Sequence, residues 1–144
     1  MEHNIDEYVK YSSKILFSET IDQAWTAYQE FLKKIGFDKI IFLSSHFSRG
    51  KNWGNPKDTL ILSNHDNSYN HSLFNNKTYF LQTHPNFKKL LEKPGSEITW
   101  TKVNLEEIQN DVVKNIVHLN NKYKITTGIQ FSLKQIKPGS ACVI

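Results

Sequence analysis

Apolar residues recur every three to four positions in two segments near the start of the chain. The segment Ile5 to Leu16 carries one helical stripe with a polar gap at Ser12. In the next segment, Thr20 and Gln23 have the spacing of a capping box, and Gly36 stands where a left-handed C-cap is expected. The stripe between them consists of Ile21, Ala24, Trp25, Tyr28, Phe31, Leu32 and Ile35. The pattern predicts two successive amphipathic helices.

Two short apolar runs follow, separated by a polar stretch. Lys39 to Ser45 is rich in β-branched and aromatic residues, which predicts a buried strand. Ser48 to Asp58 contains two glycines and a proline, which indicates a loop. Thr59 to Ser63 is again apolar and short. We therefore expect an antiparallel hairpin.

The middle of the chain is polar and rich in asparagine. Between Asn64 and Lys77, the residues Tyr69, Leu73 and Phe74 lie at near-helical spacing, so an irregular segment with a short helix is expected. Pro85 suits the first turn of a second short helix that reaches Leu91.

A longer helix is predicted after a break in the chain. Pro94-Gly95 interrupts the chain before Glu97 to Trp100. Asn104 and Glu107 resemble a second capping box, and the apolar period then continues from Leu105 to about Tyr123.

Strict alternation marks the last part of the chain. From Ile125 to Lys134, apolar and polar residues alternate, which predicts a strand with one buried face. Within it, Gly128 is expected to serve a close backbone approach or a bulge. Lys137 to Gly139 forms a turn, and Ser140 to Ile144 begins a last strand. The expected order is helix, helix, strand, strand, short helices, helix, strand, strand. It predicts an α+β fold, an α-β-α sandwich with a central antiparallel sheet and helices on both faces.

Composition and charge limit the classes of partner that we expect for this chain. The 144 residues fit a single domain spanning 1–144, and the net charge of +4 comes from scattered lysines. Arg49 is the sole arginine, so direct nucleic-acid binding by this domain is not expected. Cys142 is the only cysteine, which excludes an internal disulfide and fits a reducing compartment. No apolar run approaches membrane-spanning length, so we expect a cytoplasmic protein that contacts no membrane.

The candidate chemistry is binding rather than catalysis. Tyr, His and Trp residues between apolar strands suit a pocket that holds a small molecule by stacking and a few hydrogen bonds. No nucleophile elbow or glycine-rich oxyanion loop accompanies them, so we expect no enzyme. His65, His71 and His84 are joined by no carboxylate or second cysteine at ligand spacing, so neither a metal nor another cofactor is expected.

A series of motifs in the second half of the chain resembles a known family. Asn64-His65-Asp66 is followed by Tyr69, then by His84-Pro85, Trp100 and Thr127-Gly128. This order is similar to the autoinducer-binding domain of LuxR-type quorum-sensing regulators, over nearly the whole chain. The family has an Asn-Tyr-Pro-like tripeptide followed by Trp, then a Tyr, Asp-Pro, a second Trp and Ser-Gly. Where the family has the Tyr, this chain offers Leu73 and Phe74.

The resemblance implies a ligand site with altered head-group contacts. In the family, Trp binds the lactone carbonyl and Asp accepts the amide N–H of an acyl-homoserine lactone. Here Tyr69 would replace the indole donor, and a neutral His84 would replace the carboxylate as acceptor without its charge. The ligand-binding residues that the comparison implies are Tyr69, His84, Trp100, His65, Phe74 and Leu73. The ligand is an acyl-homoserine lactone or a different small amphipathic molecule.

Two functions follow from the resemblance. The first is a non-enzymatic ligand-sensing domain of the kind found in transcription regulators. The alternative is a stand-alone protein-interaction module that pairs with or inhibits a full-length regulator without ligand. The module's pocket would be collapsed, with Phe74, Trp100 and Phe131 filling the space between sheet and helices. The family carries a helix-turn-helix module after the sensory domain, and this sequence stops before one, so it is either part of a longer protein or a separate unit.

Overall fold

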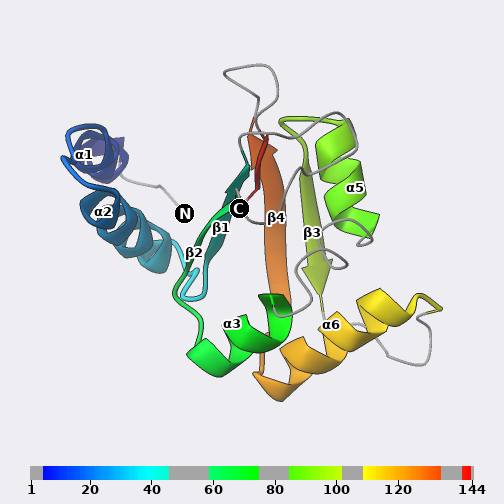
Figure 1. Cartoon of the computed structure of the whole chain (residues 1–144). Helices are drawn as coiled ribbons and strands as arrows, with labels where there is room; N and C mark the ends of the chain where they lie inside the picture. The colour runs from blue at the N-terminus through cyan, green and yellow to red at the C-terminus, as the bar shows by residue number, and fades with distance from the viewer. Residues whose placement is uncertain (1–4, 46–58, 75–84, 102–108, 134–140, 144) are drawn as a thin grey trace. The chain divides into compact units, whose positions relative to one another are not determined.

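The computed structural model describes residues 5–45, 59–74, 85–101, 109–133 and 141–143. The chain divides into two compact units, Met1–Ile40 and Ile41–Ile144. Among the helices described, none has the length and apolar character needed to cross a membrane. The elements follow one another as α1 (Ile5–Leu16), α2 (Ile21–Lys34), β1 (Ile41–Ser45), β2 (Thr59–Ser63), α3 (Asn67–Phe74), α5 (Pro85–Glu92), β3 (Glu97–Thr101), α6 (Asp111–Lys122), β4 (Thr127–Leu133) and β5 (Ala141–Val143) (Figure 1).

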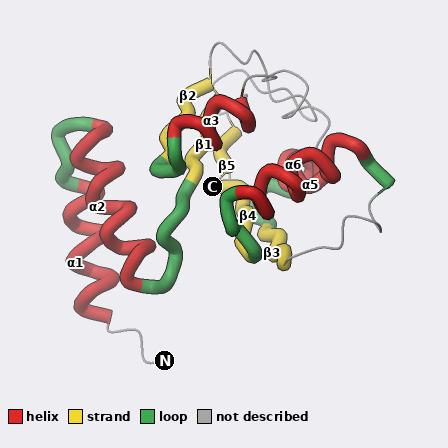
Figure 2. The backbone as a smooth tube through the Cα atoms, turned by 90° about the horizontal axis from the view of Figure 1, so that it is seen from below, coloured by secondary structure: helices red, strands yellow, loops and turns green. Residues whose placement is uncertain are grey.

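The first unit is a hairpin of α1 and α2, which run side by side (Figure 2). Phe31 of α2 packs against two tyrosines of α1, with its ring 6.0 Å from Tyr8 and 5.8 Å from Tyr11 between centroids. Tyr11 is buried in this contact. Tyr8 and Phe31 belong to the predicted stripes, whereas the buried Tyr11 lies outside the stripe predicted for the first helix. Together these aromatic side chains join the two helices.

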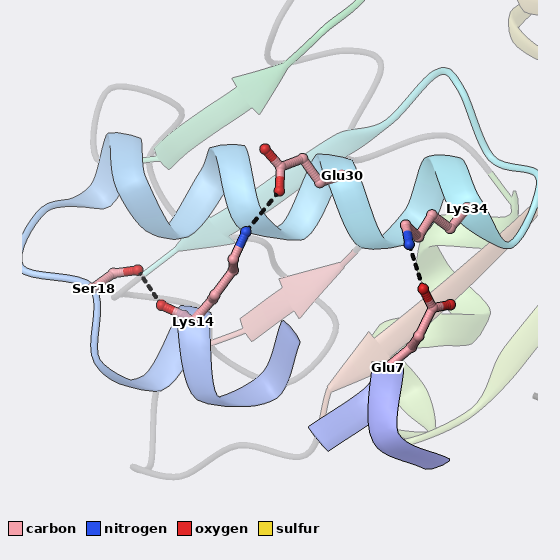
Figure 3. A network of polar contacts seen from close by, with 5 residues as sticks. All are labelled: Glu7, Lys14, Ser18, Glu30 and Lys34. Carbon is pink, nitrogen blue, oxygen red and sulfur yellow. Dashed lines mark hydrogen bonds and ion pairs between the residues drawn. The ribbon is translucent and has the colours of Figure 1, made fainter. Parts of the chain in front are cut away.

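Exposed charges link the same two helices along their length. Lys14 donates to Glu30 at 3.2 Å, and Lys34 donates to Glu7 (Figure 3). The Ser18 hydroxyl donates to the Lys14 carbonyl at 2.6 Å, where α1 ends. The hydrogen bond and positive charge of Lys34 hold the pKa of Glu7 below its ordinary value.

The predicted cap at the start of α2 is confirmed. The Thr20 hydroxyl accepts from the backbone N–H of Gln23 at 3.2 Å. The side chain of Gln23 accepts in return from the N–H of Glu19 at 2.9 Å, one residue before the cap. The first bond satisfies one N–H group of the first helical turn, and the second pairs the N–H of the residue that precedes the cap.

The predicted stop at Gly36 is also confirmed. Gly36 has φ of 101°, a conformation that glycine adopts without steric cost. Its N–H bonds the Lys33 carbonyl at 3.2 Å, and the Phe37 N–H bonds the Leu32 carbonyl at 2.9 Å. This pair of bonds is a Schellman motif.

The second unit holds one five-stranded sheet in the order β2-β1-β5-β4-β3, in which all neighbours are antiparallel. The predicted α+β class with a central antiparallel sheet is confirmed. Strand β3, which pairs with β4 along its whole length, is an element that the predicted order lacks. Its alternation of polar Glu97 and Thr99 with apolar Ile98 and Trp100 carries the signal.

The predicted start of the long helix is wrong. Helix α6 begins at Asp111, because the Asn110 side chain caps it by accepting from the N–H groups of Val112 at 3.0 Å and Val113 at 3.2 Å. The expected capping box at Asn104 and Glu107 lies outside the described residues.

Three helices pack on one face of the sheet, which we call the inner face. Leu43 of β1 belongs to a buried cluster with Tyr69, Leu73 and Phe74 of α3 and with Phe87 and Leu90 of α5. Ile98 of β3 and Leu119 of α6 pack against this cluster. Directly paired residues of antiparallel strands share a face. The register therefore gives the inner face Ile41, Leu43, Ser45, Ile61, Ile98, Trp100, Gly128, Gln130 and Ser132.

The polar residues of strand β4 lie on the inner face, beneath the helices. The alternating pattern had led us to expect its apolar residues there. Ser132, on the inner face, is only 6% exposed, whereas Leu133, on the opposite face, is 44% exposed. Ile129 and Phe131 lie on the same side as Leu133. Phe131 therefore lies on the other side of the sheet from Trp100 and does not fill the space beneath the helices as the collapsed-pocket alternative expected.

Candidate functional site

The segment between β2 and α3 is fixed by a triangle of hydrogen bonds. The Ser63 hydroxyl donates to Asn70 Oδ1 at 2.8 Å, and Asn70 Nδ2 donates to the His65 carbonyl at 3.0 Å. The N–H of His65 donates back to the Ser63 hydroxyl at 3.2 Å. These bonds hold His65 at the start of the helix that carries Tyr69.

Tyr69 is the centre of a buried polar and aromatic group. Its side chain is 5% exposed, and its hydroxyl donates to Asn120 Oδ1 of α6 at 2.8 Å. The His65 ring stacks on the Tyr69 ring at 4.4 Å between centroids, and Tyr123 meets it edge-on at 5.2 Å. Burial raises the pKa of Tyr69 to about 12, so the hydroxyl stays protonated as a donor. We call His65, Tyr69, Asn120 and Tyr123 the Tyr69 cluster.

The end of helix α6 supplies two members of this cluster, Asn120 from its last turn and Tyr123 as its C-cap. Asn120 is buried, and its backbone carbonyl accepts from the backbone N–H groups of Tyr123 at 3.2 Å and Ile125 at 2.9 Å. The Tyr123 hydroxyl donates to the Ser68 hydroxyl oxygen of α3 at 2.8 Å. Two side-chain hydrogen bonds therefore join α3 to α6, which keeps the Tyr69 ring in one position.

Leu73 and Phe74 lie on the same helix as Tyr69 and are buried in the cluster around Leu43. These two side chains lie between the Tyr69 cluster and the sheet. Of the residues predicted to bind ligand, the structure thus gathers four on or beside α3, namely His65, Tyr69, Leu73 and Phe74.

Trp100 lies on β3 with its indole against the backbone of Gly128. A Cβ atom at Gly128 would come within 2.5 Å of the ring, at Cζ2, and within 3.0 Å of Nε1. The prediction that this glycine serves a close approach of another group is confirmed. The Thr127 hydroxyl also donates to the Trp100 carbonyl at 3.0 Å, which adds a bond to the ladder of β3 and β4.

Further polar groups on the inner face come from β1 and β4. Asn86 of α5 donates through Nδ2 to Gln130 Oε1 at 3.2 Å. The Ser132 hydroxyl accepts from the Gly95 N–H at 3.1 Å and donates to the Lys93 carbonyl at 3.4 Å. Ser45 is fully buried, and within the described part of the chain its hydroxyl makes no hydrogen bond.

Together these groups can bind a molecule by hydrogen bonds and ring stacking. The Tyr69 hydroxyl already donates its hydrogen bond to Asn120, so its oxygen is available to a further group chiefly as an acceptor. His84 lies outside the described residues. In the ranges that the structure describes, no group of three or more His, Cys, Asp or Glu side chains could hold a metal ion.

Sequence reasoning missed Asn120, Tyr123, Gln130 and Ser45. The sequence did contain a signal for Asn120. The apolar period of α6 continues to position 119 or 120, and position 120 holds a polar residue. Ser45 and Gln130 occupy ordinary strand positions, and only the register shows that they share a face with Trp100.

Comparison with known proteins identifies the fold. No family model matches the sequence, and no curated protein matches it either. A solved structure does: the N-acylhomoserine lactone dependent LuxR family transcription factor CepR2 from Burkholderia cenocepacia. The TM-score is 0.70 at 14% sequence identity, and the match covers 96% of this chain and 74% of that one. The chain therefore has the fold of an N-acylhomoserine lactone dependent regulator of the LuxR family.

Proposed function

We propose that this chain is a non-enzymatic sensing domain that acts in the cytoplasm and binds a small amphipathic ligand, such as an acyl-homoserine lactone, between the inner face and α3, α5 and α6. The observation that carries the proposal is the polar side that β4 turns toward these helices, within a fold shared with a lactone-dependent regulator. A layer that served only as packing would have Ile129 and Phe131 there. Instead it has Gly128, Gln130 and Ser132.

The aromatic and apolar residues have separate roles in this proposal. Trp100 offers its indole N–H and a ring face to the ligand head, and His84 contributes an acceptor to the same end. His65, Leu73 and Phe74 enclose less polar parts of the ligand. Tyr69 acts chiefly through its bond to Asn120, which orients the ring on which His65 stacks.

The test is ligand-induced stabilisation. Acyl-homoserine lactones of increasing chain length are added at saturating concentration, with the ring-opened acids as controls, and the shift in Tm is measured. Trp100→Phe keeps an aromatic ring but removes the N–H, and is expected to weaken binding by roughly tenfold in calorimetry. Phe131→Leu, on the opposite face, is the matched control and is expected to leave Kd unchanged. No Tm shift with any lactone would refute ligand sensing by this class.

One observation favours the alternative, in which the domain pairs with a full-length regulator. Ile5, Val9, Leu16 and Phe17 form an apolar stripe on and beside α1 and are 76%, 54%, 77% and 79% exposed. Exposed apolar surface of this kind is typical of interaction sites. Co-expression with a LuxR-type receptor and a reporter separates the two functions. A pairing module would lower the reporter signal without any lactone effect on its own Tm, and Val9→Lys would abolish that inhibition.

A further inference from the structure

Helix α1 has two different sides. The side that contacts α2 holds Tyr11, which is 6% exposed, and the charged side chains of Glu7 and Lys14, which bond to residues of α2 (Figure 3). Positions 5, 9, 12 and 16 lie on another side, because successive residues of an α-helix are rotated by about 100°. Three of these four positions are apolar. The hairpin of α1 and α2 therefore leaves one apolar side of α1 unused.

The spacing on this second side is that of a helix-pairing surface. Ile5, Val9, Ser12 and Leu16 follow one another at intervals of four, three and four residues, which are the intervals of the a and d positions in a coiled coil. Ile5, Val9 and Leu16 are 76%, 54% and 77% exposed. We call these four residues the α1 seam. Side chains at this spacing interdigitate with those of a second helix that has the same spacing.

The charges along α1 select the orientation and the kind of partner. The first turn is acidic, with Asp6 and Glu7, and the last turn is basic, with Lys14. A second α1 placed antiparallel brings each acidic turn beside a basic turn and opposes the two helix dipoles. With Ile5 opposite Leu16, the polar Ser12 then lies opposite Val9 and not opposite another serine. An anionic lipid surface fits less well, because the acidic first turn repels it.

The exposed area is sufficient for such a pair. Two aromatic residues next to the seam in sequence, Tyr8 and Phe17, are 62% and 79% exposed. Taking about 100 Å² for an aliphatic and about 200 Å² for an aromatic side chain, the seam and these rings expose roughly 500 Å² per copy. Two copies would bury about 1,000 Å², which is the lower limit for a specific interface. A reversible pair with a Kd of roughly 10 µM is therefore expected.

We propose that α1 is a self-association surface, through which two copies of this chain pair with their α1 seams antiparallel. The inference goes beyond the proposed function, because it uses no residue of the inner face and requires no ligand. Both copies contribute the same residues to the interface, so each substitution acts twice.

Sedimentation velocity of the full 144-residue chain tests the proposal. The wild-type chain is expected to change from monomer to dimer between about 1 and 200 µM. Val9→Lys places a charge in two layers of the interface and is expected to raise Kd roughly a hundredfold. Ser12→Leu replaces the polar member of the seam and is expected to lower Kd roughly tenfold. Leu133→Lys is the matched control, because it introduces the same charge at an apolar position of β4 that is 44% exposed, and it keeps the wild-type Kd.

Circular dichroism checks that each variant folds, and Leu16→Glu replaces Val9→Lys if the latter does not. A wild-type chain that stays monomeric over this range overturns the inference. A dimer that survives Val9→Lys, or that dissociates in Leu133→Lys, overturns it equally. If the monomeric chain pairs only with a co-expressed LuxR-type receptor, or binds only vesicles of anionic lipid, the seam has that partner and self-association is refuted. The Tm shift with lactones is a separate measurement, so the proposed function stands or fails independently.

Discussion

Replacing Gly128 with alanine tests the contact between the backbone of β4 and the indole of Trp100. An added Cβ would lie 2.5 Å from Cζ2 and 2.7 Å from Cε2 of Trp100. Non-bonded carbon atoms have their optimal separation at about 3.5–4.0 Å, so the ring has to move by roughly 1 Å or the strands have to separate. Overpacking of this kind costs about 1–3 kcal/mol.

The backbone conformation of Gly128, by contrast, favours alanine. Gly128 is not among the described residues with positive φ, so alanine fits its strand conformation. An alanine that fits stabilises a strand by about 0.5–1 kcal/mol relative to glycine, because the unfolded chain loses freedom. The net expectation for Gly128→Ala is a loss of roughly 1–2 kcal/mol from the free energy of unfolding.

A double-mutant cycle separates the two effects. Urea unfolding followed by circular dichroism is measured for the wild type, Gly128→Ala, Trp100→Val and the double variant. Valine keeps the strand preference of position 100 but removes the ring. In that background, alanine at position 128 is expected to be neutral or to stabilise by up to about 1 kcal/mol. The contact would be refuted if Gly128→Ala cost the same free energy in both backgrounds.

Three further predictions concern other parts of the chain. Burial raises the pKa of Tyr69 from 10.0 to about 12, so the unfolded chain loses this proton first, and stability falls by roughly 3 kcal/mol as pH rises through that window. Tyr69→Phe removes the bond to Asn120, and its stability does not fall with this ionisation. The difference in unfolding free energy between wild type and variant should therefore shrink toward pH 12. A constant difference contradicts the burial argument. Gly36 has φ of 101°, so Gly36→Ala should cost about 1–2 kcal/mol and Gly36→Asn less, measured as Tm; equal costs would contradict it. Lys34→Gln should raise the pKa of Glu7 in an NMR titration, and an unchanged value would mean that the pair does not form in solution.

The sequence predicted best those features whose cause is local. The start of α2 at Thr20 and its end at Gly36 depend on hydrogen bonds between residues three to five positions apart, so the residue types alone specify them. Local signals also compete, as α6 shows. Both Asn104 and Asn110 stand before a helical period, and the cap of the observed helix is Asn110.

The site depends on contacts that local patterns do not contain. The motif order points to Tyr69 as a functional candidate, but its partner Asn120 is 51 positions away, on a helix that reaches it only through the packing of α3 on α6. Ser45, whose hydroxyl has no hydrogen-bond partner among the described residues, takes its buried place from the register of β1 with its neighbours. Sequence periodicity reports which residues share a face, but it does not report what covers that face.

The two sides of β4 show this distinction within a single strand. Alternation in Thr127–Leu133 correctly separates an apolar from a polar side, yet the polar side faces the helices. Placing polar groups under a helical layer costs free energy unless each finds a partner. Gln130 bonds Asn86, Ser132 bonds Gly95 and Lys93, and the indole of Trp100 covers Gly128. These polar groups are tolerated beneath the helices because hydrogen bonds within the fold replace the water that they lose.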